Sequence, residues 1–220
     1  MIPDTDAPGS TLLIQFAKWP ERGRVKTRLA AALGEQGALE AHIALTRAVL
    51  GQLRATGLPV AFWWDRPLAT PPPEASSVLA ELSAGEVAQG YQQGADLGER
   101  MSRALSRGLE DHAQVIIIGS DCPSVDPEYI AAARLALMQQ DLVMGPSDDG
   151  GYVLIGARRT TPSMLSDIEW GTPGVLAQTR QRLSDCGLSH GVLEPRWDVD
   201  EPADWERFLR WRAERAVDES

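Results

Sequence analysis

Asparagine is absent from the 220 residues, so the chain has no acceptor for N-linked glycosylation. The two cysteines, Cys122 and Cys186, lie in unrelated contexts and indicate neither a disulfide framework nor a zinc site. No apolar run approaches the ~18 residues of a membrane helix. The first ten residues, MIPDTDAPGS, carry two acids and no base, unlike a signal peptide. These absences predict a cytoplasmic protein that does not enter a membrane.

Several catalytic motifs are also missing. The chain has three scattered histidines and no HExxH, GxSxG or CxxC, which disfavours zinc proteases, α/β-hydrolases and thioredoxin-like enzymes. It has neither GxxxxGK[ST] nor GxGxxG, which disfavours P-loop enzymes and dinucleotide-binding dehydrogenases.

Positive charge is scarce. The formal net charge is -10, so we expect no binding to nucleic acid or anionic membranes. An anionic substrate would therefore need a local basic patch or a metal ion.

The hydrophobic pattern predicts strands that alternate with helices. Strands are expected at 11–16, 59–64, 86–91, 114–119, 141–145 and 151–156. Helices are expected at 35–55, 97–109, 127–139, 173–185 and 202–214. We expect residues 1–10 to be a disordered or extended tail and residues 11–216 to form one α/β domain. Its sheet should be mostly parallel, with helices on both faces.

The loop after the first strand concentrates basic residues. Residues 18–28, KWPERGRVKTR, carry five positive charges and include both lysines of the chain, Lys18 and Lys26. Lysine and arginine bind phosphate oxygens, and this loop position commonly holds phosphates in nucleotide-binding folds. A solvated surface loop is the alternative. We predict that Lys18, Arg24, Lys26 and Arg28 bind phosphate.

Asp121 ends the most apolar strand, where an aspartate projects into the crevice of a parallel sheet. A carboxylate there suits Mg²⁺ or Mn²⁺, although it could instead cap the next turn, through Ser124.

Asp198 and Asp200 alternate and should face one side of an extended segment, as two metal-binding carboxylates would. The alternative is that Asp200 or Glu201 only begins the last helix, with Asp204 favouring its dipole.

A second acidic cluster, Ser147 to Tyr152, reads SDDGGY. An Asp-Gly turn needs no function. Near the crevice, however, one of its acids could contact an acceptor or act as a base.

Taken together, six segments closely resemble a bacterial glycosyltransferase-like family of the nucleotide-diphospho-sugar transferase superfamily. They read FAKWPERGRVKTRL, QGADLGERM, IIIGSDCPSVDPEYIAAA, LVMGPSDDGGYVLIG, WGTPGVLAQT and DVDEPADW. Some members carry the label arsenosugar-biosynthesis or radical-SAM/selenodomain-associated transferase. The resemblance implies a single Rossmann-like GT-A domain.

The resemblance also implies roles for individual residues. The loop from Lys18 to Arg28 would hold the nucleotide phosphates, and the metal, Mg²⁺ or Mn²⁺, would be held by Asp121 with Asp198 or Asp200. The turn would border the second substrate through Asp148, Asp149, Gly150 and Gly151. Many GT-A enzymes have an Asp-x-Asp motif where this chain has Ser120-Asp121-Cys122, so the second metal ligand is open.

We therefore expect a metal-dependent glycosyltransferase that moves a sugar from a nucleoside-diphospho-sugar to a small-molecule acceptor. Asp121 and Asp149 are the expected catalytic residues, with Asp149 as the candidate base. A nucleotidyltransferase that uses a nucleoside triphosphate is the first alternative. A catalytically silent nucleotide-binding subunit is the second. The sequence gives no oligomeric state.

Overall fold

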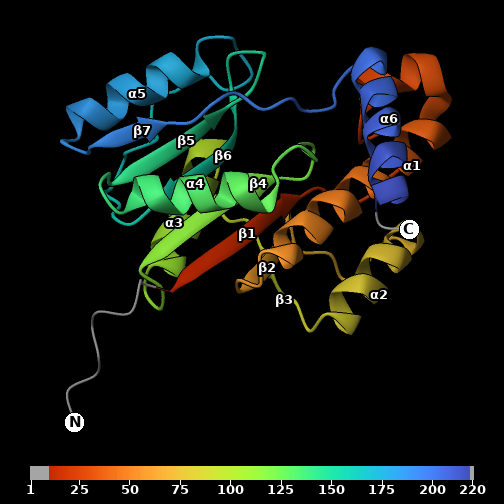
Figure 1. The fold of residues 1–220 in the computed structure, drawn as a ribbon, viewed down its shortest axis with the longest axis horizontal. Helices are drawn as coiled ribbons and strands as arrows, with labels where there is room; N and C mark the ends of the chain where they lie inside the picture. Colours follow the sequence, from red (N-terminus) through yellow and green to blue (C-terminus); the bar gives the residue numbers. More distant parts are fainter. Residues whose placement is uncertain (1–9, 219–220) are drawn as a thin grey trace.

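The computed structural model describes residues 10–218, so residues 1–9 of the expected tail at 1–10 lie outside this range. Within it, a seven-stranded sheet has the order β3-β2-β1-β4-β6-β5-β7 (Figure 1). Its strands are β1 (Thr11–Ala17), β2 (Val60–Trp64), β3 (Ala88–Tyr91), β4 (Gln114–Gly119), β5 (Leu142–Pro146), β6 (Tyr152–Ala157) and β7 (His190–Val192). Only β6 runs antiparallel to its neighbours, β4 and β5. The predicted α/β fold with a mostly parallel sheet is confirmed.

Helices follow most of the strands. They are α1 (Thr27–Ala55), α2 (Ser76–Ala84), α3 (Leu97–Gly108), α4 (Pro127–Leu137), α5 (Val175–Asp185) and α6 (Pro202–Asp218), with a short 3₁₀ turn, η1 (Pro73–Ala75), before α2. None of the helices in the described residues is both long enough and apolar enough to cross a membrane.

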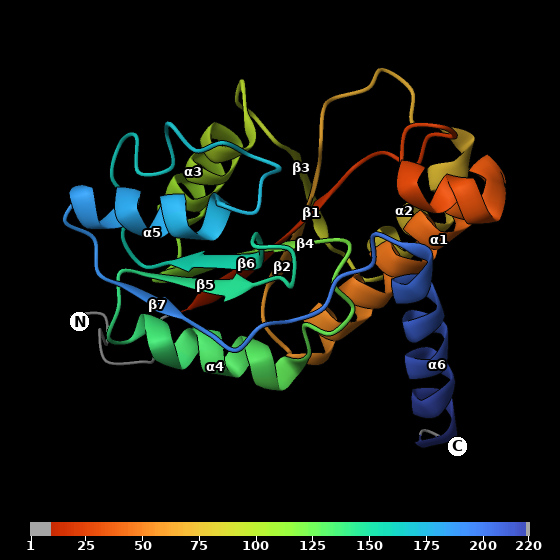
Figure 2. The ribbon, with the colours of Figure 1, turned by 90° about the horizontal axis from the view of Figure 1, so that it is seen from above.

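Helices cover both faces of the sheet. Successive side chains of a strand point to opposite faces, so a central strand packs against both helical layers. In β4, Val115 and Ile117 pack with α3 and α5, whereas Ile116 and Ile118 pack with α1 and α4. Figure 2 shows α3 and α5 above the sheet and α4 below it. Since β4 is buried on both faces, its sequence is continuously apolar.

Three regions depart from the expected elements. Strand β7 was not predicted, and it pairs with β5. Helix α2 was not predicted, and it packs Val78 and Leu82 against Phe62 and Trp64. Helix α1 begins at Thr27, eight residues before the expected start, and Gly34 interrupts it with a φ of 70°. The basic loop is therefore shorter than predicted, and its last residues form the N-terminus of a helix.

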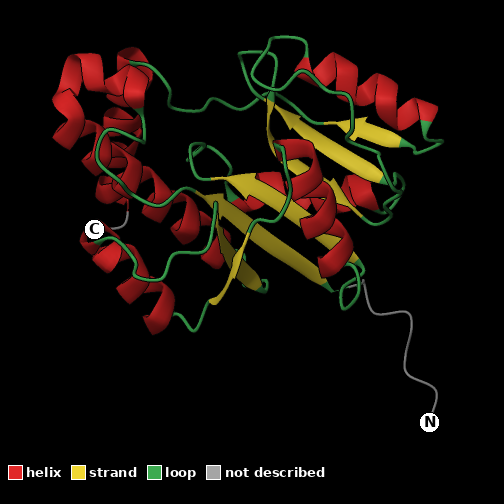
Figure 3. Ribbon diagram, turned by 180° about the vertical axis from the view of Figure 1, so that it is seen from behind, coloured by secondary structure: helices red, strands yellow, loops and turns green. Residues whose placement is uncertain are grey.

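The last helix lies apart from the sheet. It packs against α1 through Phe208, which contacts the buried side chains of Leu29 and Leu45. Figure 3 shows α1 and α6 together at one end of the molecule. The extended segment before α6 crosses from β7 to this end, past the carboxyl ends of the central strands.

Candidate functional site

A cavity of about 300 Å³ lies at the carboxyl ends of β1 and β4. Its walls come from the loop after β1, the start of α1, the end of β4 and the segment before α6. The lining residues with polar side chains include Lys18, Arg24, Lys26, Arg28, His42, Gln92, Ser120, Asp121 and Asp200. The sequence predicts that the loops after Phe16, Gly119 and Gly145 line one site. The first two meet at this cavity, and the loop after Gly145 does not line it.

Lys26 lies at the centre of this arrangement. Its side chain is only 5% exposed, and its ammonium nitrogen lies 3.0 Å from Asp121 and 3.1 Å from Asp200. It also donates to the carbonyl of Val199. An ammonium group has three donors, so these three contacts use all of them. Lys26 therefore joins the loop after β1 to both other walls of the cavity.

The charge of Lys26 follows from these contacts. Burial lowers its pKa, but the charges of Asp121 and Asp200 outweigh burial and hold the pKa above its ordinary value. Its backbone is left-handed, with a φ of 47°. This conformation ends the loop and turns the chain into α1.

The other basic residues of the loop divide into two groups. Lys18, Arg24 and Arg28 line the cavity and have largely exposed side chains. Arg28 lies 3.4 Å from Asp200, and Arg24 lies 3.5 Å from Glu21. Arg22 does not line the cavity and lies 4.0 Å from Glu35. The predicted set of four thus shares one cavity, and three of the four are accessible to a ligand.

The N-terminus of α1 opens onto the same cavity. Lys26, Thr27 and Arg28 line it, no side chain caps this helix end, and its first turn contains no acid. Free N–H groups and the helix dipole favour an anion at such an end. The accessible side chains of Lys18, Arg24 and Arg28 and the N-terminus of α1 therefore face the same cavity.

The carboxylates have specific surroundings. Ser124 donates to the Trp197 carbonyl and Asp126 caps α4, so Asp121 is not a helix cap. Asp204 accepts from the backbone of Asp200 and Glu201 and so caps the start of α6, which leaves the Asp200 carboxylate facing Lys26 and Arg28.

The pKa values of Asp121 and Asp198 are shifted in opposite directions. Burial would raise the pKa of Asp121, but Lys26 and then His42 outweigh it and hold the pKa low. The pKa of Asp198 is raised to about 6, first by burial and then by the charges of Asp200, Asp149 and Asp121. A nearby cation would lower the pKa of Asp198 and stabilise its charged form.

A metal ion would have to share this region with Lys26. Among residues 10–218, no three His, Cys, Asp or Glu side chains are grouped so that they could hold an ion by themselves. Mg²⁺ usually binds one or two carboxylates and takes its remaining ligands from water and phosphates. The donors present fit that mode, with Asp198 and one of its neighbouring carboxylates.

His42 is a cavity residue that the sequence did not single out. It lies on α1, is buried, and its Nε2 lies 3.0 Å from the Lys18 carbonyl. Burial lowers its pKa, against the charge of Asp121. No sequence pattern signalled it, because its position depends on how α1 packs behind the loop.

A second cavity, of about 250 Å³, adjoins the first and shares Phe16, Leu97 and Gly119 with it. Its walls are mainly apolar and include Tyr152 and Trp170, whose rings meet edge to face with centroids 6.2 Å apart. The polar groups of Asp149, Gly151 and Asp198 also line it.

The acidic turn lies beside the second cavity. Asp149 accepts hydrogen bonds from the Ser147 hydroxyl and the Gly151 N–H, and the first of these is the main reason its pKa is lowered. Asp148 is exposed and lines neither cavity. Of the residues predicted to border the second substrate, Asp149 and Gly151 therefore line the second cavity and Asp148 does not.

Gly150 has a structural role. Its φ is 91°, and a Cβ there would lie 2.3 Å from the Pro173 carbonyl oxygen. The Gly150 carbonyl accepts from Leu176 in the first turn of α5. Only glycine fits this close approach, which fixes the turn against the helix.

Solved structures share this fold. A protein of Desulfovibrio desulfuricans G20, whose assignment as a nucleotide-diphospho-sugar transferase is itself provisional, is 29% identical with a TM-score of 0.76, over 87% of this chain and 82% of its own. CMP:2-keto-3-deoxy-manno-octonic acid synthetase in complex with CTP is 12% identical with a TM-score of 0.59, over 94% and 99%. 4-Diphosphocytidyl-2C-methyl-D-erythritol synthase from Anaerococcus prevotii DSM 20548 is 10% identical with a TM-score of 0.59, over 92% and 97%.

These neighbours confirm the predicted superfamily fold. The expected class of enzyme, a transferase, agrees with the assignment of the Desulfovibrio protein. The finer arsenosugar or radical-SAM-associated assignment stays a prediction. No curated protein matches the sequence. The model of one family, described as "Uncharacterized protein conserved in bacteria (DUF2064)", matches residues 56–172, just over half of the chain. The chain therefore belongs to the DUF2064 family.

Proposed function

We propose that the protein is a nucleotide-dependent transferase whose 300 Å³ cavity binds the phosphates of its donor. One observation carries the proposal: the Lys26 ammonium joins Asp121 and Asp200, while Lys18, Arg24 and Arg28 surround the same cavity. In a chain of net charge -10, this concentration of cations favours an anionic ligand.

The three accessible cations and the buried Lys26 have different roles in the proposed site. Lys18, Arg24 and Arg28 contact the phosphates, together with the N–H groups at the start of α1. Lys26 keeps the two carboxylates in place, since all its donors are already used. This changes the role we expected for Lys26 from phosphate binding to positioning.

The transferred group is a sugar in the function we favour, with a nucleoside-diphospho-sugar as donor. The 29% identical relative with a nucleotide-diphospho-sugar transferase assignment supports this choice. The donor diphosphate would lie in the first cavity and the acceptor in the adjoining apolar one, which Tyr152 and Trp170 line. Accumulating negative charge on the leaving diphosphate would be stabilised by the three accessible cations.

Asp149 holds the acceptor in this proposal. It lines the second cavity, but its hydrogen bonds from Ser147 and Gly151 lower its pKa and make it a weak base. We therefore assign it to orienting an acceptor hydroxyl, and not to removing the proton.

A Mg²⁺ or Mn²⁺ ion would be held by Asp198 with Asp121 or Asp200. When bound, it would supply Lewis-acid neutralisation of the donor phosphates.

Nucleotidyl transfer is the second candidate. The segment Ser120-Asp121-Cys122 offers one acid, and Lys26 already lies between Asp121 and Asp200. A site whose fixed charge comes from a lysine and accessible arginines would also suit a triphosphate, with pyrophosphate as the leaving group.

Product analysis separates the two reactions. The protein is incubated with nucleoside triphosphates or nucleoside-diphospho-sugars, an acceptor panel, and Mg²⁺ or Mn²⁺. Release of nucleoside diphosphate supports glycosyl transfer, and release of pyrophosphate supports nucleotidyl transfer. Nucleotide binding without any turnover across the panel would favour a silent nucleotide-binding subunit and overturn both.

A further inference from the structure

A third cavity, of about 350 Å³, shares no lining residue with the two described above. It lies between the loop after β4, the segment before α6, and α6 itself. Its lining residues are Pro123, Ser124, Asp126, Pro195, Arg196, Trp197, Arg207, Trp211 and Arg215. This volume falls within the range of small-molecule sites, about 300–1,000 Å³.

Three arginines line this cavity. Arg196, Arg207 and Arg215 make no ion pair with any residue between 10 and 215 whose side chain is described. The only acid in the lining is Asp126, whose carboxylate already accepts from the Tyr129 N–H. The cavity is therefore positive in a strongly acidic chain.

Aromatic rings hold the three guanidinium groups in place. Arg196 lies 4.1 Å from the centroid of Tyr129, Arg207 lies 4.5 Å from Trp197, and Arg215 lies 5.1 Å from Trp211. Stacking occupies the faces of a guanidinium group and leaves its in-plane N–H donors available for an anion. Arg196 gives one of these donors to the Pro195 carbonyl and keeps the others. It also limits the entropy that each side chain would lose on binding.

We propose that this cavity binds a phosphate group, either as free phosphate or as part of a small phosphorylated molecule. Three preorganised guanidinium groups match the several oxygens of a phosphate better than the single charge of a carboxylate. The volume leaves room for an organic portion against Trp197, Trp211 and the two prolines of the lining.

The walls of this cavity continue into the candidate active site. Trp197 precedes Asp198, and its carbonyl accepts from the hydroxyl of Ser124 at 2.8 Å. The N–H of Val199 donates to the carbonyl of Asp121 at 3.0 Å. Because Ser124 and Trp197 line the cavity, an anion bound there would lie beside the two segments that carry Asp121 and Asp198.

The test follows the indole N–H signals of the ¹⁵N-labelled protein by NMR during titration with inorganic phosphate and, separately, with glycerol 3-phosphate. Trp197→Phe and Trp211→Phe identify the two signals. We expect both signals to shift and the shifts to saturate. The affinity obtained from them should fall about tenfold or more in Arg207→Gln and in Arg215→Gln, because each substitution removes a charge-assisted contact.

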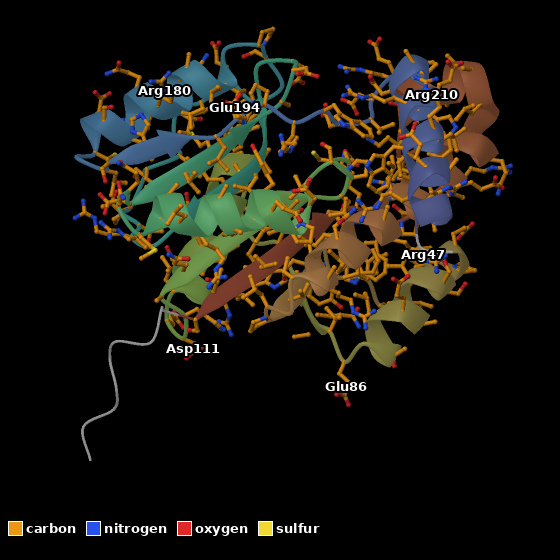
Figure 4. All side chains as sticks on the ribbon, in the orientation of Figure 1. Arg47, Glu86, Asp111, Arg180, Glu194 and Arg210 are labelled. Atoms are coloured by element: carbon orange, nitrogen blue, oxygen red, sulfur yellow. The ribbon has the colours of Figure 1, made fainter. Side chains whose placement is uncertain are left out.

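Arg210→Gln is the matched control, since Arg210 is exposed on the same helix and does not line the cavity (Figure 4). Binding of glycerol 3-phosphate identifies an organic phosphate as the ligand, and binding of inorganic phosphate alone identifies the free ion. Shifts that chloride reproduces, or that Arg210→Gln weakens as much as Arg207→Gln, would overturn the proposal. Phosphate-dependent shifts of the backbone amide signals of Lys18 and Arg24, with neither indole signal moving, would place the ion in the first cavity and would also overturn the proposal.

Discussion

The ammonium nitrogen of Lys26 lies 3.0 Å from the carboxylate of Asp121, although 95 residues separate the two in the sequence. The contact joins the start of α1 to the end of β4. With Asp200 it forms a group of one buried cation and two half-exposed anions, which fixes the shape of the cavity.

Lys26→Ala should therefore destabilise the fold, since it removes a donor from Asp121, from Asp200 and from the Val199 carbonyl. We expect a loss of about 2 kcal/mol, or roughly 4–8 °C in the thermal midpoint. Lys18→Ala is the matched control, because Lys18 is the other lysine of the loop and is exposed. Equal midpoints for the two variants would show that Lys26 does not position the carboxylates.

Arg24→Gln and Arg28→Gln should each weaken nucleoside diphosphate binding about tenfold, because each removes a cation that faces the first cavity. Arg22→Gln is the control, since Arg22 lies in the same loop and pairs with Glu35. Isothermal titration calorimetry measures all three. An Arg22→Gln variant that loses as much affinity as the others would point to a diffuse charge effect and not to a site.

The contribution of Asp198 to the stability of the protein should fall as the pH rises from about 4 to about 6. Its pKa is raised on folding, so the native state binds this proton more tightly than the unfolded state does. The resulting penalty is absent below about pH 4 and complete above about pH 6. Asp198→Asn should thus be more stable than the natural protein at pH 8, on the order of 1 kcal/mol given the partial exposure of the group, and equal to it near pH 4.

The comparison of the two proteins by thermal unfolding at both pH values isolates Asp198 from the other acids. Mg²⁺ or Mn²⁺ should narrow the difference at pH 8 if Asp198 helps to hold the ion. A constant difference at both pH values would contradict the raised pKa.

Gly150→Ala should destabilise the protein by about 2 kcal/mol or more, because a methyl group would collide with Pro173 at a positive φ. Gly171→Ala separates strain from collision: its φ is 80°, but a Cβ there meets nothing within 4 Å, so the cost should be about 1 kcal/mol. Chemical denaturation measures both. If Gly150→Ala lost substrate binding without losing stability, the predicted substrate contact would replace the structural role.

The sequence predicted the strands well where burial determines their composition. Strand β4 reads as an apolar run because both its faces are covered, and the aspartate after it then had to face the sheet edge. Helix α2 was missed because the prolines before it dominate the pattern, although Val78 and Leu82 are buried. Strand β7, three residues long, depends on pairing with β5 and leaves no pattern of its own.

The candidate site was predictable as a set of charged residues and not as an arrangement. The charge excess of the loop identified Lys18, Arg24, Lys26 and Arg28, but only the fold distinguishes the buried Lys26 from the accessible three. His42 and Trp170 reach the two cavities through helix packing and a loop crossing, which neither spacing nor composition encodes.

The central place of β1 in the sheet constrains how the protein is made. Strand β1 pairs with β2 on one side and with β4 on the other. Its first residue, Thr11, lies opposite Gln114, the first residue of β4. During synthesis from the N-terminus, the apolar segment Thr11–Ala17 therefore leaves the ribosome about a hundred residues before its second partner. Such a nascent chain exposes an unpaired strand edge that can aggregate or recruit a chaperone. By the same reasoning, residues 56–172 alone, which match the family model but lack β1, should not fold as an independent unit.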